Sequence, residues 1–251
     1  MRSIPLVLLA LSLVATQTGR AQSADDDALR QMLVEGNAAV QAGQFDAAIT
    51  RFQAVLDRTE PDSPAAGDLQ LRLGETYRRK GDYDSAIRSL ARANEILPGN
   101  ATIVGTLALT LDAAGNRAEA QRAYRATLEI DPNNATAMNN LAFLLAEGGT
   151  DLDDALQLAT RAMAISPDSM QITDTAGWVR LKRGENDAAI ALFADAVAKE
   201  PAEESFRDHL LMALERKGDH TGVFGETISA LKQIGSPENL AKVTALIQGL
   251  K

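Results

Sequence analysis

Apolar residues recur along most of the chain at the spacing of amphipathic helices. Leu69, Leu73 and Tyr77 stand at four-residue intervals, as do Leu141 and Leu145. Such intervals place side chains on one face of a helix. Alanine is abundant and often stands beside leucine, while aromatic residues make up only 4% of the chain. The pattern therefore predicts closely packed helices rather than a sheet.

The helical pattern repeats with a period of about 34 residues, which is typical of stacked helix–turn–helix units. The turns follow one another at steps of 38, 34, 34, 35 and 34 residues, at Gly43, Gly81, Gly115, Gly149, Gly184 and Gly218. Seven residues before each turn stands a residue that is small in the first five units: Gly36, Gly74, Ala108, Ala142, Gly177 and then Leu211. Small residues let two antiparallel helices approach closely. Prolines then end four of the second helices, at Pro98, Pro132, Pro167 and Pro201.

One unit matches a known repeat almost completely. Leu73-Gly74-Glu75-Thr76-Tyr77, followed by Gly81-Asp82-Tyr83 and Ala86, resembles the signature of the tetratricopeptide repeat. The resemblance implies an all-α, right-handed solenoid of about six tandem helix–turn–helix repeats with a C-terminal capping helix. The array is expected over residues 29–235, with units at 29–62, 67–100, 101–134, 135–169, 170–203 and 204–235.

The two ends of the chain differ from the repeats. Residues 1–21 join a basic start at Arg2 to an apolar core and a small-residue ending at Ala21, which predicts a cleavable secretory signal peptide. Residues 22–28 form an acidic leader. We therefore expect an exported, periplasmic protein with no membrane insertion after signal cleavage. Residues 236–251 are expected to form the capping helix, with Ser236 at its start and an apolar face of Leu240, Val243, Ile247 and Leu250.

Charge and composition narrow the function. The net charge of −9 argues against a nucleic-acid partner, which needs a basic face. The absence of cysteine excludes thiolate catalysis and cysteine-ligated metals. The two histidines, His209 and His220, lack a third metal ligand nearby in the sequence and are interpreted as packing or solvated residues. Asp151, Asp153 and Asp154 lack the spacing of a calcium loop, so we expect no metal, no cofactor and no enzyme activity.

In tetratricopeptide repeats the first helices line a concave groove, where polypeptide partners usually bind. In this chain the residues after the small crossing positions are Asn37, Glu75, Leu109, Phe143, Trp178 and Met212. We propose Leu109, Phe143, Trp178 and Met212, together with Asn139 and Asp174, as a partner-binding groove. The alternative is that the apolar members pack inside the array, because apolar stripes on helices are usually core.

The resemblance implies a protein or peptide partner. A subclass of the family grips a chaperone's terminal carboxylate through basic residues, but this chain has Gln171 and Thr175 where those residues stand. Units four and five resemble those of exported bacterial repeat proteins of envelope assembly, secretion or polysaccharide export. We therefore expect a scaffold or adaptor in such a pathway. The alternative is a structural module that self-associates into a homo-oligomer.

Overall fold

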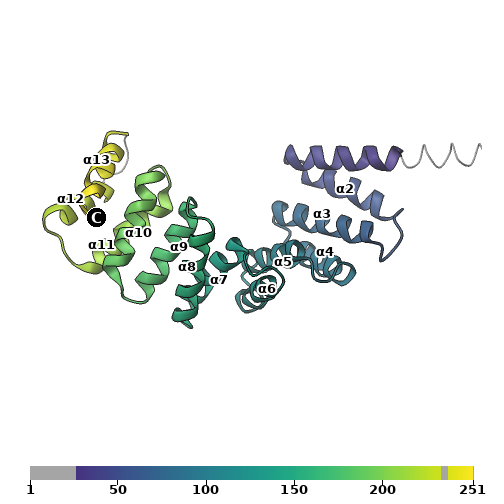
Figure 1. Cartoon of the computed structure of the whole chain (residues 1–251). Helices are drawn as coiled ribbons and strands as arrows, with labels where there is room; N and C mark the ends of the chain where they lie inside the picture. Colours follow the sequence, from purple (N-terminus) through teal and green to yellow (C-terminus); the bar gives the residue numbers. More distant parts are fainter. Residues whose placement is uncertain (1–26, 233–236, 251) are drawn as a thin grey trace, which may run out of the picture. The chain divides into compact units, whose positions relative to one another are not determined.

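The computed structural model describes residues 27–232 and 237–250, and every regular element within them is a helix. The predicted all-α fold of tandem helical repeats is therefore confirmed. After a first helix over residues 27–41, the elements are α2 (Phe45–Leu56), α3 (Pro64–Lys80), α4 (Tyr83–Ile96), α5 (Ala101–Ala113), α6 (Arg117–Ile130), α7 (Ala135–Gly148), α8 (Leu152–Ile165), α9 (Met170–Lys182), α10 (Asn186–Lys199), α11 (Glu204–Lys217), α12 (Gly222–Lys232), α13 (Pro237–Ile247) and the short 3-10 helix η1 (Gln248–Leu250) (Figure 1).

The chain forms two compact units, one up to Gly115 and the other from Asn116. In the first, α3 packs against both α2 and α4, and α4 packs against α5. In the second, each helix from α6 to α13 packs against the next, and α9 also contacts α7 and α11. The first helices of successive repeats therefore lie side by side within this unit.

Local sequence explains where the helices begin and end. Ser63, Asp82 and Asn134 each accept a hydrogen bond from a backbone N–H in the first turn of the helix that follows. Gly81 ends α3 with a φ of 87°, a left-handed conformation that glycine adopts without strain. The next residue, Asp82, then donates its backbone N–H to the carbonyl of Tyr77 at 2.9 Å and begins the return helix.

The predicted small positions lie where two helices cross. A Cβ atom added at Gly74 would lie 2.5 Å from Cγ of Leu90, which is fully buried on α4. The equivalent atom at Gly177 would lie 2.7 Å from the ring of Phe193 on α10. Each pair is separated by 16 residues, so the repeat register places a large residue of the second helix over a glycine of the first.

We expect Gly74→Ala to lower the free energy of unfolding by about 1–2 kcal/mol. The clash with Leu90 destabilises the fold by more than the higher helix propensity of alanine stabilises it. Gly148→Ala is the matched control, because its Cβ would meet only the hydroxyl of Thr150 at 3.4 Å. Urea unfolding followed by circular dichroism measures both. Equal stabilisation by the two changes would show that the crossing is not close at Gly74.

The ends of the chain are only partly described. The predicted signal peptide (1–21) and most of the acidic leader (22–28) lie outside the described residues, as does Ser236. In the described C-terminal part, α13 packs against α12 and α10, and Val243 and Ile247 are fully buried. Among residues 27–232 and 237–250, none of the helices combines the length and the apolar composition that a membrane span requires.

Candidate functional site

Three first helices, α7, α9 and α11, form one surface of the second unit, which we call the first-helix face. Trp178 of α9 lies at its centre and contacts aromatic rings on both sides. The ring of Phe143 on α7 stacks with it at a centroid distance of 6.4 Å, and the His209 imidazole on α11 lies 4.7 Å away on a tilted plane. Met212 follows His209 by three residues and so lies on the same side of α11.

Two charged residues hold the indole of Trp178 in place. Its ring N–H donates to Oε1 of Glu147 at 3.0 Å. The ammonium of Lys182 lies 4.7 Å from the ring centroid and 3.1 Å from the same oxygen of Glu147. Burial disfavours the charged form of Glu147, but Lys182 and Trp178 outweigh it, so the pKa of Glu147 is lowered. Trp178 is therefore a fixed part of this face.

Beneath Trp178 lies a pair of ionisable side chains that the sequence did not indicate. Nδ1 of His209 lies 2.8 and 3.0 Å from the two carboxylate oxygens of Asp174. Burial raises the pKa of Asp174, and the hydrogen bond from His209 only partly offsets it. The His209 ring also packs 5.5 Å from that of Phe193. His209 is thus a packing residue, as interpreted, but one that also pairs with a buried carboxylate 35 residues earlier.

The structure distributes the proposed groove residues between exposed and buried positions. Phe143 and Met212 are exposed, at 36% and 46%, whereas Trp178 and Asp174 are both only 8% exposed. Leu109 is half-buried on α5 and belongs to the other unit. Trp178 is therefore packed against its neighbours, as the alternative for the apolar members describes, and Asp174 is buried as well. The exposed apolar surface of this face consists of Phe143 and Met212.

Asn139 lies one helical turn before Phe143 on α7 and is half-buried. Its amide nitrogen donates to the side-chain oxygen of Asn140 at 3.1 Å. Asn140 in turn donates to the hydroxyl of Tyr124 at 3.2 Å. The side-chain oxygen of Asn139 is buried and has no hydrogen-bond partner among the described residues. This oxygen is therefore an internal acceptor and is not part of the exposed surface of this face.

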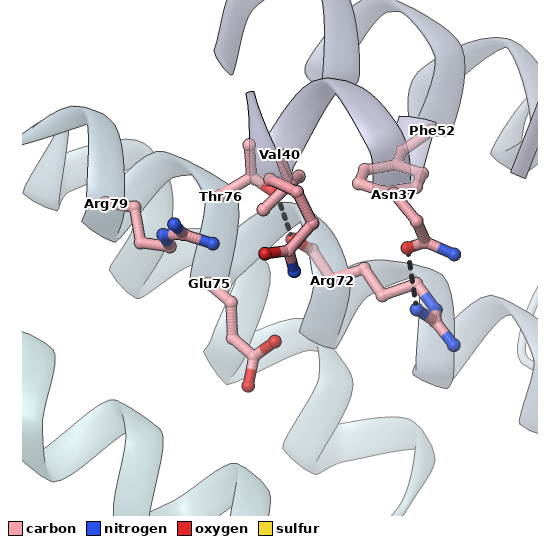
Figure 2. A pocket seen from close by; sticks show the side chains of 8 residues that line it. Asn37, Val40, Phe52, Arg72, Glu75, Thr76 and Arg79 are labelled. Carbon is pink, nitrogen blue, oxygen red and sulfur yellow. Dashed lines mark hydrogen bonds between the residues drawn. The ribbon is translucent and has the colours of Figure 1, made fainter. Parts of the chain in front are cut away.

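The first unit contains a pocket of about 240 Å³ between the helix of residues 27–41 and α3, with Phe52 of α2 also in its lining. Val40, Phe52 and Thr76 supply its apolar and buried part, and the rest of the lining is polar: Asn37, Gln41, Arg72, Glu75 and Arg79 (Figure 2). Asn37 and Glu75 are the two polar members of the groove series found in the sequence. The arginines and Gln41 were missed, although positions 72, 75 and 79 share one helical face.

Two of the three aspartates considered as metal ligands, Asp153 and Asp154, have other partners. Asp153 forms an ion pair with Arg183, and Asp154 one with Arg125 at 2.9 Å. His220 is exposed before α12. Within the described ranges, no three acidic or histidine side chains are grouped so that they could hold a metal ion.

Comparison with known structures identifies the same fold elsewhere. A tetratricopeptide repeat protein from Parabacteroides merdae is 15% identical, with a TM-score of 0.68 over 88% of this chain and 98% of that one. MamA from Desulfovibrio magneticus is 18% identical, with a TM-score of 0.58 over 73% and 96%. A thermophilic tetratricopeptide repeat protein from Thermus thermophilus is 21% identical, with a TM-score of 0.55 over 74% and 98%.

Sequence comparison gives the family directly. No curated protein matches the chain significantly. One tetratricopeptide repeat model matches residues 33–101 and 175–226, and a second matches residues 77–142. These matches cover more than half of the chain and coincide with the helical pairs described above. The chain belongs to the tetratricopeptide repeat family.

Proposed function

We propose that this chain is a non-catalytic scaffold or adaptor, and that the first-helix face of its second unit binds a polypeptide partner. Tetratricopeptide repeats generally mediate protein–protein interaction. The observation that supports the proposal most is the exposure of Phe143 and Met212 on either side of the fixed ring of Trp178. Large apolar side chains on a rigid surface are the usual anchors of protein interfaces.

The rigidity of this face favours binding. Trp178 is held by Glu147 and Lys182, and Phe143 stacks on it, so little side-chain freedom is lost when a partner covers them. Apolar contact with the exposed side chains of Phe143 and Met212 would fix the position of an extended or helical peptide.

The site of action is also a proposal. The N-terminal pattern of residues 1–21 supports export, and we propose that the protein acts in the periplasm. Envelope assembly, secretion or polysaccharide export are the pathways that fit an exported adaptor. A second candidate is a structural module that self-associates through this same face, for which the exposed Phe143 and Met212 could serve equally.

The double change Phe143→Ser/Met212→Ser should abolish capture of the envelope proteins that the wild-type chain retains, and should leave its melting temperature within a few degrees. Both side chains are already substantially exposed, so little packing is lost. Ile165→Ser is the matched control, because Ile165 is an apolar residue of α8 that is 43% exposed. Quantitative mass spectrometry of affinity-purified complexes provides the comparison.

Three results would decide between the candidates. Loss of the same partner from the double variant but not from Ile165→Ser supports the adaptor. A wild-type dimer in size-exclusion chromatography with light scattering that becomes a monomer in the double variant favours self-association. Equal capture by all three proteins would contradict a binding role for this face.

A further inference from the structure

The pocket of the first unit contains three charged side chains of alternating sign. Arg72, Glu75 and Arg79 follow one another along α3, and Figure 2 shows Arg72 and Arg79 on opposite sides of Glu75. Asn37 and Gln41, one turn apart on the helix of residues 27–41, lie across from them. The order of charges along the pocket is therefore positive, negative, positive.

The two arginines of the pocket lack the carboxylate partners that Arg51 and Arg92 of this unit have. Arg51 pairs with Glu35 at 2.9 Å, and Arg92 pairs with Asp62 and Glu95. Among the described residues, neither Arg72 nor Arg79 forms an ion pair, although the whole chain has 34 acidic and 25 basic side chains. Both guanidinium groups thus face the pocket without a carboxylate of their own.

Contacts with neutral groups hold the arginines in position. Nη1 of Arg72 donates to the side-chain oxygen of Asn37 at 3.0 Å, which leaves its other N–H groups free to donate. The guanidinium of Arg79 lies 5.5 Å from the centroid of the Phe45 ring. Each arginine is therefore oriented before any ligand arrives, and each retains donors for a carboxylate.

We propose that this pocket binds a peptide segment in the polyproline II conformation, with two acidic side chains three residues apart. Arg72 and Arg79 are seven residues apart on α3, a rise of about 10.5 Å along the helix axis. Three residues of polyproline II chain complete one turn and advance about 9 Å, so side chains three residues apart project on the same side. One acidic side chain meets Arg72 and the other meets Arg79, and the amides of Asn37 and Gln41 bind the peptide backbone between them.

Glu75 makes the site selective. Its carboxylate lies between the two arginines and repels a compact inorganic anion or a run of adjacent acidic residues. It favours a neutral donor or a lysine in the middle of the segment. The ligand is accordingly a polypeptide with separated carboxylates, bound in the first unit and independently of the first-helix face of the second.

Fluorescence anisotropy of three labelled peptides, the first two of them blocked at both ends, tests the inference with the full-length chain. The first peptide has glutamate at positions 1 and 4 and neutral residues elsewhere. The second has the same two glutamates at positions 1 and 2. The third has glutamines at positions 1 and 4 and a free C-terminal carboxylate, which distinguishes side-chain from terminal carboxylates. Inorganic phosphate serves as the competitor.

We expect the first peptide to bind at least about tenfold more tightly than the other two, at low ionic strength, where exposed charges are least screened. Arg72→Gln and Arg79→Gln should each weaken it several-fold, and together by about tenfold or more. Arg88→Gln is the matched control, because Arg88 is an exposed arginine on α4 outside the pocket. Circular dichroism should show unchanged helicity in all variants, since these side chains are on the surface.

Three kinds of result would overturn the proposal. The first is absence of detectable binding of the first peptide at millimolar concentration. The second is evidence of general charge attraction: Arg88→Gln weakens binding as much as Arg72→Gln does, or phosphate or the adjacent-glutamate peptide binds as tightly as the first peptide. The third concerns the peptide with a free C-terminus. Tight binding of only the third peptide would assign the pocket to a chain terminus and would also contradict the three-residue spacing of the two acidic side chains.

Discussion

Replacing Trp178 by alanine is expected to lower the free energy of unfolding by about 3–5 kcal/mol, the usual cost of removing a buried large aromatic side chain. Trp178 is 8% exposed, contacts the rings of Phe143 and His209, and donates its N–H to Glu147. The change removes these contacts and leaves a cavity between α7, α9 and α11. Urea unfolding followed by circular dichroism measures the loss.

Phe143→Ala is the control for this prediction. Because Phe143 is 36% exposed, its replacement should lower the free energy of unfolding much less. In the wild-type protein, the fluorescence of Trp178, the sole indole, should be blue-shifted and weakly quenched. Equal melting of Trp178→Ala and the wild type, with red-shifted and readily quenched wild-type emission, would show that the indole is open to solvent. Trp178 would then be part of the surface that contacts the partner, and not a packed residue that supports that surface.

The second large effect is expected at His209. His209→Ala should cost about 2–3 kcal/mol, because it leaves the carboxylate of Asp174 buried without its partner. The expected loss is smaller than that from breaking a fully buried ion pair, because the His209 side chain is 22% exposed. Urea unfolding at neutral pH gives the value.

The double variant His209→Ala/Asp174→Asn separates the charge from the packing. A neutral amide needs less compensation than a carboxylate, so the double variant should recover at least about 1 kcal/mol of the loss. Burial raises the pKa of Asp174 above its ordinary value of 3.8. As the pH falls, Asp174 therefore becomes protonated in the folded state at a higher pH than in the unfolded state. The difference between the two variants should therefore shrink as the pH falls toward 3.8. A double variant no more stable than His209→Ala at any pH would show that Asp174 is not a buried charge.

The helices and their pairing could be predicted because they depend on local, periodic features. Gly81 and the turn glycines at the same register end the first helices, and the small residues at the crossings set which faces meet. The series that contains Phe143, Trp178 and Met212 could be found in the sequence because equivalent positions of successive repeats lie on the same side of the array, whatever residue occupies them.

The burial of individual members of that series could not be predicted from the register. Trp178 is covered because Glu147, 31 residues earlier, accepts its N–H and Lys182 lies over its ring. His209 is 35 residues from Asp174, one repeat away, and only the packed structure shows that they pair. Similarly, the charge order of Arg72, Glu75 and Arg79 is visible in the sequence, but the pocket requires the helix of residues 27–41 opposite them.

Site-specific photo-cross-linking in cells tests most directly whether the first-helix face binds a polypeptide. Benzoylphenylalanine is placed at position 143 or 212, and at position 165 as the control on α8. We predict a discrete adduct with another polypeptide from positions 143 and 212 and none from position 165. An adduct of twice the chain's own mass would identify the partner as a second copy. Absence of any adduct at 143 and 212, or an equal adduct at 165, would contradict the proposed function of this face.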